Sequence, residues 1–128
     1  MIINKVVLQF KDKTIKKGST GDFLPNKKNF HLELPKGEIV EITMEDLKAV
    51  FFVKDHLGDS EYKEQYTENI PGGGRKIKVQ FSDGEILIGY SQGYAPNRPG
   101  FFLTPADTKG NNERIFVLKS ATESVEFT

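Results

Sequence analysis

The sequence contains no cysteine, only two histidines and no net charge. Without cysteine the chain has no disulfide framework, no thiol nucleophile and no thiolate metal site, a composition that fits a reducing cytoplasm. His31 and His56 lie in different segments with no second histidine at ligand spacing, which argues against a metal site and against histidine-based catalysis. Because eighteen basic and eighteen acidic residues cancel, no overall field attracts nucleic acid or an anionic membrane.

Long apolar runs and signature loops are also absent. No stretch approaches the roughly 20 apolar residues that span a bilayer, and residues 1–10 lack the features of a signal peptide. The glycine-rich stretches 17–21 and 71–75 lack the spacing of a phosphate-binding loop. No carboxylate pair is placed in a cleft by the sequence. We therefore expect a cytoplasmic protein that has no membrane segment, is not an enzyme, and carries no catalytic, cofactor-binding or metal-binding residues.

The sequence does contain one segment that occurs in two similar copies. Residues 9–32 and 80–103, aligned without a gap at an offset of 71, share nine identities in 24 positions. Such self-similarity indicates a tandem repeat. Each copy alone is about 50 residues, a size at which a single hydrophobic core is marginal, so two copies fused into one folding body are expected.

Alternating apolar residues predict five short strands in the first copy, over 5–10, 14–19, 30–34, 38–43 and 49–53. Residues 44–48 are too short for a stable α-helix and suit a single helical or 3₁₀ turn. A glycine interrupts the second strand at the same place in both copies (Gly18 and Gly89), which indicates a bend where backbones crowd. The second copy follows the same order.

These patterns divide the chain into a first barrel repeat (1–54), an acidic and glycine-rich connector (55–75) and a second barrel repeat (76–128). The repeats resemble small SH3-like barrels, and most closely the Sm-like version, whose opening pattern is similar to residues 6–18 and 77–89. The expected fold class is all-β, with two tandem five-stranded SH3/Sm-like barrel repeats packed into one compact unit. The middle of the connector, residues 59–67, could form a short acidic helix.

The resemblance to Sm-like proteins implies single-stranded RNA binding, but the uridine-binding residues do not match. Asp22 precedes the aromatic Phe23 where the Sm pattern has it following, and the second copy has Gly93 there. The whole chain is also similar to a family of uncharacterised bacterial proteins, through the phrases at 96–107 (PNRPGFFLTPAD) and 111–117 (NNERIFV). Members of that family sometimes accompany PilZ-type regulatory domains, and the resemblance implies no established activity.

The two Pro-Asn-basic loops are the most distinctive candidate site. Their cations lie on loop tips near an aromatic residue, an arrangement that suits a phosphate or a carboxylate. The simpler interpretation, which we favour, is that proline and asparagine shape the turn and the cation is solvated. The candidate loop-binding residues are Asn26, Lys27, Lys28, Asn97 and Arg98.

A second candidate is the lysine-rich face of the first repeat, where a nucleic-acid site would require stacking aromatics. A solvated surface is the simpler interpretation. Its residues are Lys11, Lys13, Lys16, Lys17, Lys27 and Lys28.

A third candidate is an apolar face. Outward positions that are polar in the first copy are apolar in the second, and leaving them wet would be unfavourable by about 25 cal/mol per Å² of apolar area. Either the two repeats pack on each other there, which we favour, or the face docks a partner protein or a second copy of the chain. The candidate apolar interface consists of Phe51, Leu87, Tyr90, Phe102 and Phe116.

The sequence thus favours a non-catalytic binding or regulatory module, such as a protein-interaction adaptor, with a protein partner or homodimer contact through the second repeat. The alternative function is Sm-like single-stranded RNA binding through the basic face of the first repeat.

Overall fold

The computed structural model describes residues 4–54, 74–91, 94, 98–105 and 112–127. It consists of ten strands, and its two 3₁₀ turns are the only helical elements in these ranges. The N-terminal half contains β1 (Asn4–Phe10), β2 (Ile15–Thr20), β3 (Asn29–Glu33), β4 (Ile39–Thr43), η1 (Met44–Asp46) and β5 (Leu47–Val53). The C-terminal half contains β6 (Arg75–Phe81), β7 (Ile86–Ser91), β8 (Gly100–Pro105), β9 (Asn112–Leu118), η2 (Lys119–Ala121) and β10 (Thr122–Phe127).

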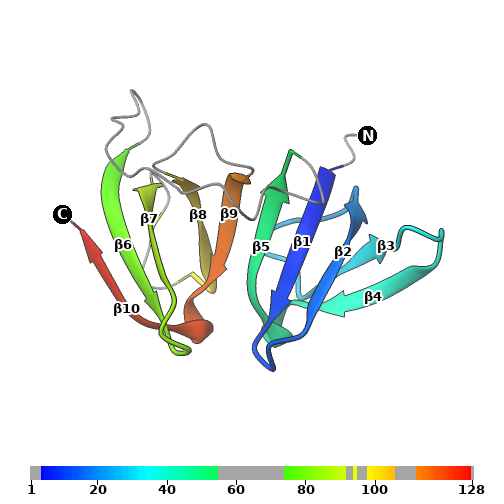
Figure 1. The fold of residues 1–128 in the computed structure, drawn as a ribbon, viewed down its shortest axis with the longest axis horizontal. Coiled ribbons are helices and arrows are strands. Elements are labelled where there is room, and N and C mark those ends of the chain that lie inside the picture. The colour runs from blue at the N-terminus through cyan, green and yellow to red at the C-terminus, as the bar shows by residue number, and fades with distance from the viewer. Residues whose placement is uncertain (1–3, 55–73, 92–93, 95–97, 106–111, 128) are drawn as a thin grey trace, which may run out of the picture.

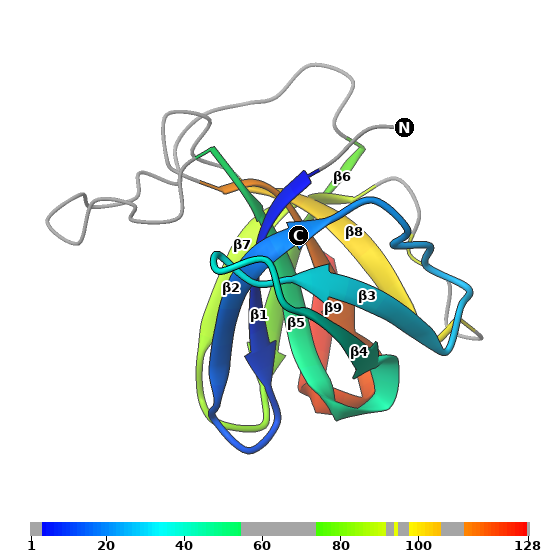
Figure 2. The same cartoon turned by 90° about the vertical axis from the view of Figure 1, so that its right-hand side faces the viewer.

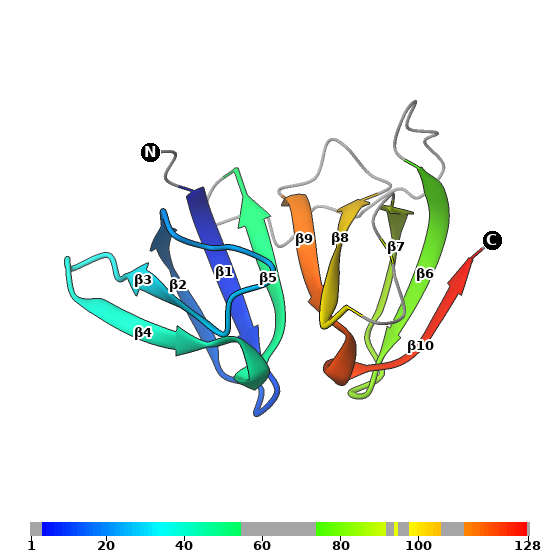
Figure 3. The same ribbon diagram turned by 180° about the vertical axis from the view of Figure 1, so that it is seen from behind.

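All ten strands belong to one antiparallel sheet with the order β10-β6-β7-β8-β9-β5-β1-β2-β3-β4. Figure 1 shows the two halves side by side, with β9 and β5 adjacent in the middle. The same arrangement is seen from behind in Figure 3. The all-β prediction is confirmed. Two separate closed barrels are not what the described strands form: the sheet is open, because the outer edge of β5 is used for pairing with β9.

Strand pairing is equivalent in the two halves. The first hairpin pairs Val6 with Gly18, and the second pairs Ile77 with Gly89, so the registers differ by the same offset of 71 as the sequence copies. A side chain at either glycine has no room, because a β-carbon would overlap a backbone carbonyl of the next strand. The sheet therefore bends sharply at this point in each half, and in Figure 2 β3 crosses in front of β1 and β2.

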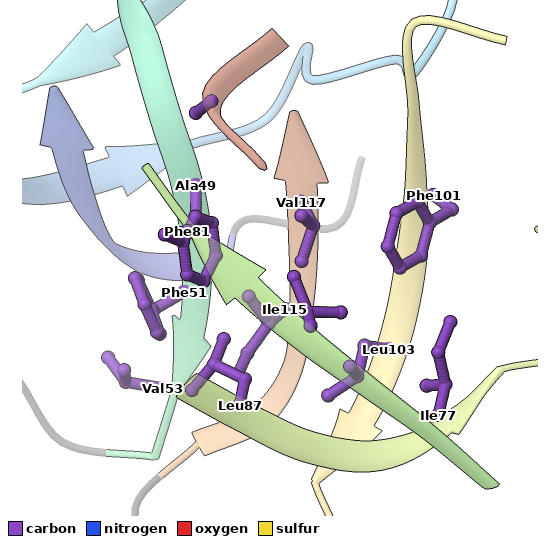
Figure 4. Close-up of a cluster of buried hydrophobic side chains, with 12 residues drawn as sticks. Ala49, Phe51, Val53, Ile77, Phe81, Leu87, Phe101, Leu103, Ile115 and Val117 are labelled. Atoms are coloured by element: carbon purple, nitrogen blue, oxygen red, sulfur yellow. The ribbon is translucent and has the colours of Figure 1, made fainter. Parts of the chain in front are cut away.

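Each half has its own hydrophobic core, and each core contains side chains of both halves. The alternation along β5 sends Val50 and Phe52 to the N-terminal core, whereas Phe51 enters the C-terminal core. In the same way β9 sends Ile115 to its own core and Phe116 to the N-terminal one. Figure 4 shows Phe51 beside residues of the C-terminal core. We call the paired strands β5 and β9 the joint.

The two aromatic residues after the bent strands pack in equivalent ways. The ring of Phe23 meets those of Phe30 and Phe52 edge-on, with centroids 5.2 and 5.5 Å apart. Tyr94 meets Phe101 in the same manner at 5.1 Å. These rings pack against the cores, and the described loop residues that follow them (Pro25, Lys27, Lys28, Arg98 and Pro99) are exposed.

Candidate functional site

The two Pro-Asn-basic loops, far apart in sequence, line one groove between the halves. Residues 25–28 follow β2, and Arg98 and Pro99 precede β8. The groove has a volume of about 770 Å³. Its remaining walls come from the two 3₁₀ turns, which lie near each other along the lower edge of the molecule in Figures 1 and 3.

Equivalent backbone hydrogen bonds hold each loop against the 3₁₀ turn of its own half. The amide of Met44 donates to the carbonyl of Lys28 at 2.8 Å, and the amide of Lys119 donates to the carbonyl of Pro99 at 3.0 Å. A side-chain bond at the groove also crosses between the halves: the Lys11 ammonium donates to the Ser120 hydroxyl at 2.7 Å. The walls of the groove are therefore tied to the sheet.

The lining of this groove is predominantly basic. Two carboxylates, Glu45 and Asp46, stand against five cationic side chains. The positive excess inside a concave surface favours an anionic ligand, since the walls hold the charges closer together than a flat surface would. The five cationic residues are Lys11, Lys27, Lys28, Arg98 and Lys119.

An apolar groove of about 580 Å³ adjoins the basic one and shares Pro25, Asn26, Arg98 and Pro99 with it. Its floor contains Phe102, whose side chain is half-buried. The Phe102 ring packs against that of Phe116 with centroids 5.0 Å apart, and the Arg114 guanidinium lies 4.8 Å from its centroid. A cationic wall and an aromatic floor are thus continuous with each other.

Four of the five predicted loop residues meet at these grooves. Asn26 and Arg98 line both, and Lys27 and Lys28 line the basic one. Asn97 lies outside the described residues. The loop site was inferred within each copy; the structure makes it a shared site, with one loop supplied by each half.

The five predicted interface residues are internal instead of forming an exposed patch. Phe51 and Leu87 belong to the C-terminal core, and Phe116 belongs to the N-terminal core. Tyr90 is buried and Phe102 is half-buried. The two halves pack on each other through Phe51 and Phe116, and of this set the half-buried Phe102 stays accessible in the apolar groove.

The lysines of the first repeat do not form one face. Lys16 and Lys17 lie on β2 and Lys13 lies in the β1–β2 turn, whereas Lys11, Lys27 and Lys28 line the groove. Within the described ranges, the large hydrophobic residues that are exposed are all aliphatic: Ile15, Leu24, Ile39 and Ile86.

Asp22 has a structural partner. Its carboxylate accepts hydrogen bonds from the His31 amide at 2.9 Å and from the Thr20 hydroxyl at 3.2 Å, and lies 2.7 Å from the His31 ring. Partial burial raises the pKa of Asp22, but the hydrogen bonds from His31 and Thr20 outweigh it and lower the pKa below 3.8. This carboxylate connects the loop after β2 to β3.

Lys48 belongs to the segment 44–48, for which the sequence predicts a helical turn. It lies in β5, where it is 7% exposed, and its ammonium reaches across to Asp83 at 2.7 Å and to Glu85. Burial lowers the pKa of Lys48, but the two carboxylates outweigh it and raise the pKa above 10.5. The sequence feature that could have revealed this residue is a lysine near the start of the otherwise apolar strand β5. The structure shows that this lysine forms an ion pair between the halves.

In the described part of the chain, no group of three or more histidine, cysteine, aspartate or glutamate residues is placed to hold a metal ion. None of the helical segments in those ranges has the length and apolarity required to cross a membrane.

The fold and the groove define an all-β protein in which two five-strand halves share one sheet and line a basic groove between them. Residues 3–128 match the model of a family of unknown function, DUF6982, and the chain belongs to that family. No curated protein and no solved structure matches the chain.

Proposed function

We propose that the protein is a non-enzymatic binding module that holds an acidic segment of a partner protein in the groove between its halves. The observation that carries the proposal is the convergence of Lys27, Lys28 and Arg98, from two loops about 70 residues apart in sequence, on one groove beside an aromatic floor. Duplication of a five-strand unit explains how a single loop motif supplies both walls.

A peptide with carboxylates and one apolar side chain fits both parts of the site. Its carboxylates would pair with the cations of the basic groove, and Arg98 offers the planar fork that carboxylates prefer. Its apolar side chain would cover Phe102 between the two prolines. The volumes of about 580 and 770 Å³ lie in the range of about 300–1,000 Å³ typical of binding sites.

RNA is less well supported as the ligand. Sequence-tolerant binding of single strands uses exposed aromatic rings for base stacking. The exposed large hydrophobic residues in the described ranges are aliphatic, and the lysines of β2 lie away from the groove. The proposal includes no catalytic step.

The regulatory role and the cytoplasmic location that the sequence suggests stay predictions. The SH3/Sm-like character of each half also stays a prediction, and the equivalent strand order and the close backbone approach at Gly18 and Gly89 support it.

The proposal is tested by fluorescence anisotropy with a labelled peptide of alternating aspartate and glutamate around one phenylalanine. A lysine version of the peptide and a labelled oligouridine serve as comparison ligands. The variant K27E/R98E should weaken binding of the acidic peptide at least about tenfold, because it reverses one charge on each wall. The control K16E/K36E changes the net charge equally at exposed positions outside the groove and should leave affinity within about twofold.

Equal effects of the two double variants would overturn the groove as the site. Preference for oligouridine over the acidic peptide, at about 50 mM salt and with a steep salt dependence, would favour RNA as the ligand.

A further inference from the structure

The sheet ends in two free edges whose strands are the counterparts of the joint strands. Among the described residues, β4 pairs only with β3, and β10 pairs only with β6. β4 holds the place in the N-terminal half that β9 holds in the C-terminal half, and β10 corresponds in the same way to β5. The joint is therefore a pairing between the fifth strand of one half (β5) and the fourth strand of the other (β9). The remaining fourth strand (β4) and fifth strand (β10) form the two free edges of the sheet.

Two aromatic residues at the joint correspond to two glutamates at the free edges. Aligned on the strands, Phe116 of β9 corresponds to Glu41 of β4, and Phe51 of β5 corresponds to Glu126 of β10. At the joint, Phe116 is 1% exposed in the N-terminal core and Phe51 is 6% exposed in the C-terminal core. Glu41 and Glu126 are both exposed.

The register of the joint shows where these glutamates would go if the free edges paired. At the joint Val50 opposes Phe116, and Phe51 opposes Ile115. The same register between β10 of one chain and β4 of another would set Val125 opposite Glu41, and Glu126 opposite Val40. Each carboxylate would then enter an apolar core, a position that is strongly unfavourable for an unpaired charge.

Apart from Glu123, the positions of the two edges next to these glutamates include several apolar residues. Val40 on β4 and Val125 and Phe127 on β10 are partly buried hydrophobic residues that pack on their own cores. Ile39 at the start of β4 is 65% exposed and would oppose Phe127 in that register.

We infer that β4 and β10 are complementary in strand register, so that β10 of one chain could pair with β4 of a second copy. Glu41 and Glu126 prevent this pairing in the unmodified protein. Charged side chains on edge strands are a known means of preventing edge-to-edge association. The two glutamates limit the sheet to one chain.

The inference is tested with the single variants E41F and E126F, alone and mixed, by sedimentation velocity. Each variant alone should remain a monomer of 14.4 kDa, because any joint it forms still buries one carboxylate. The mixture should form a one-to-one heterodimer with roughly twice that mass, since only the β4 edge of E41F and the β10 edge of E126F can pair without placing Glu41 or Glu126 in a core. The double variant E41F/E126F should form larger assemblies, because both of its edges can pair.

The control E33F replaces an exposed glutamate of β3 that lies on neither edge strand and in neither groove, and it should remain monomeric. Far-ultraviolet circular dichroism and thermal unfolding verify that each variant is folded, and E41L and E126L replace any phenylalanine variant that is not. Absence of a heterodimer from folded variants, or head-to-tail association of the unmodified protein at equal concentration, would overturn the inference.

Discussion

The two halves of this protein have the same strands, the same order and equivalent registers, yet they differ in what they bury. His31 of the N-terminal half is exposed and hydrogen-bonded to Asp22, whereas its counterpart Phe102 packs against the aromatic rings of the joint. Ser19 is likewise half-buried where Tyr90 is buried. Backbone pairing is thus insensitive to these side chains, and at Phe102 the rings of Phe52 and Phe116 at the joint provide the cover.

The strands at the joint and at the free edges also differ in burial. β5 is buried along its whole length, whereas its counterpart β10 has Glu123 and Glu126 exposed. A strand with two covered faces requires apolar residues at successive positions, and a strand at an edge requires alternation. The following experiments test how far the two halves depend on these differences.

The largest expected effect is at the joint. Phe116→Ala should destabilise the protein by about 3–5 kcal/mol, because it removes a fully buried ring and leaves a cavity in the N-terminal core. The matched change at the free edge, Glu41→Ala, should alter the free energy of unfolding by less than about 0.5 kcal/mol. Urea unfolding of both variants measures the difference. Similar costs at the two positions would contradict the packing of the joint.

A smaller effect is expected at the ion pair between the halves. The variant D83N/E85Q should cost about 1–3 kcal/mol, because it leaves the Lys48 ammonium buried without a counter-charge. Lys48→Met should be within about 1 kcal/mol of the unmodified protein, since it removes the buried charge as well. Thermal unfolding at constant ionic strength distinguishes these outcomes.

The control for this pair is Asp12→Asn in the corresponding turn of the N-terminal half. Asp12 and Asp83 each accept a hydrogen bond from the amide two residues later, at 2.9 and 3.0 Å. The control therefore reports the turn alone. If D12N cost as much as D83N/E85Q, the charge on Lys48 would not be the cause.

The first turns of the two halves differ at one backbone position. Lys13 has φ 74° where the C-terminal half has Gly84 with φ 94°. Lys13→Gly should stabilise the protein by about 0.5–1 kcal/mol, because glycine adopts this conformation without strain. Gly84→Ala should destabilise by a similar amount, and since a β-carbon there meets no atom within 4 Å, the effect isolates the backbone. Chemical denaturation of both variants tests the pair.

The smallest expected effect is on the dependence of the free energy of unfolding on pH. Because the pKa of Asp22 is lowered below its ordinary value of 3.8, its ionised form stabilises the fold at higher pH. This contribution is complete above about pH 4 and is lost as the pH falls through the lower folded-state pKa. Asp22→Asn should therefore reduce the loss of unfolding free energy between about pH 5 and 2, by less than about 1 kcal/mol. An unchanged acid dependence would show that Asp22 has no such role.

Much of the fold followed from local sequence pattern. The strand predicted over 30–34 is observed at Asn29–Glu33, and the turn predicted after residue 43 is the 3₁₀ turn Met44–Asp46. Period-two alternation and turn residues act over a few positions, so a single copy carries the information. The joining of the two copies into one open sheet was not recoverable in this way, because the pairing of β5 depends on which distant strand competes for its edge.

For the candidate site, the loop residues were recognisable and their meeting was not. Pro25 and Lys27 form a turn through a hydrogen bond between Lys27 and Leu24, a local feature. Arg98 reaches the same groove only because the two halves stand side by side in the sheet. Lys119 and Ser120 had no local signal at all, since their place in the wall depends on η2 facing η1.

The sequence by itself determined the repeated order of strands, the turns, and the bends at Gly18 and Gly89, because these depend on backbone sterics and nearest neighbours. Only the tertiary structure decided that Phe51 and Phe116 are core residues instead of a docking patch, and that cations from two loops form one groove. The physical reason is that burial and electrostatic fields depend on what lies across a contact, and at the joint that contact spans two halves of the chain.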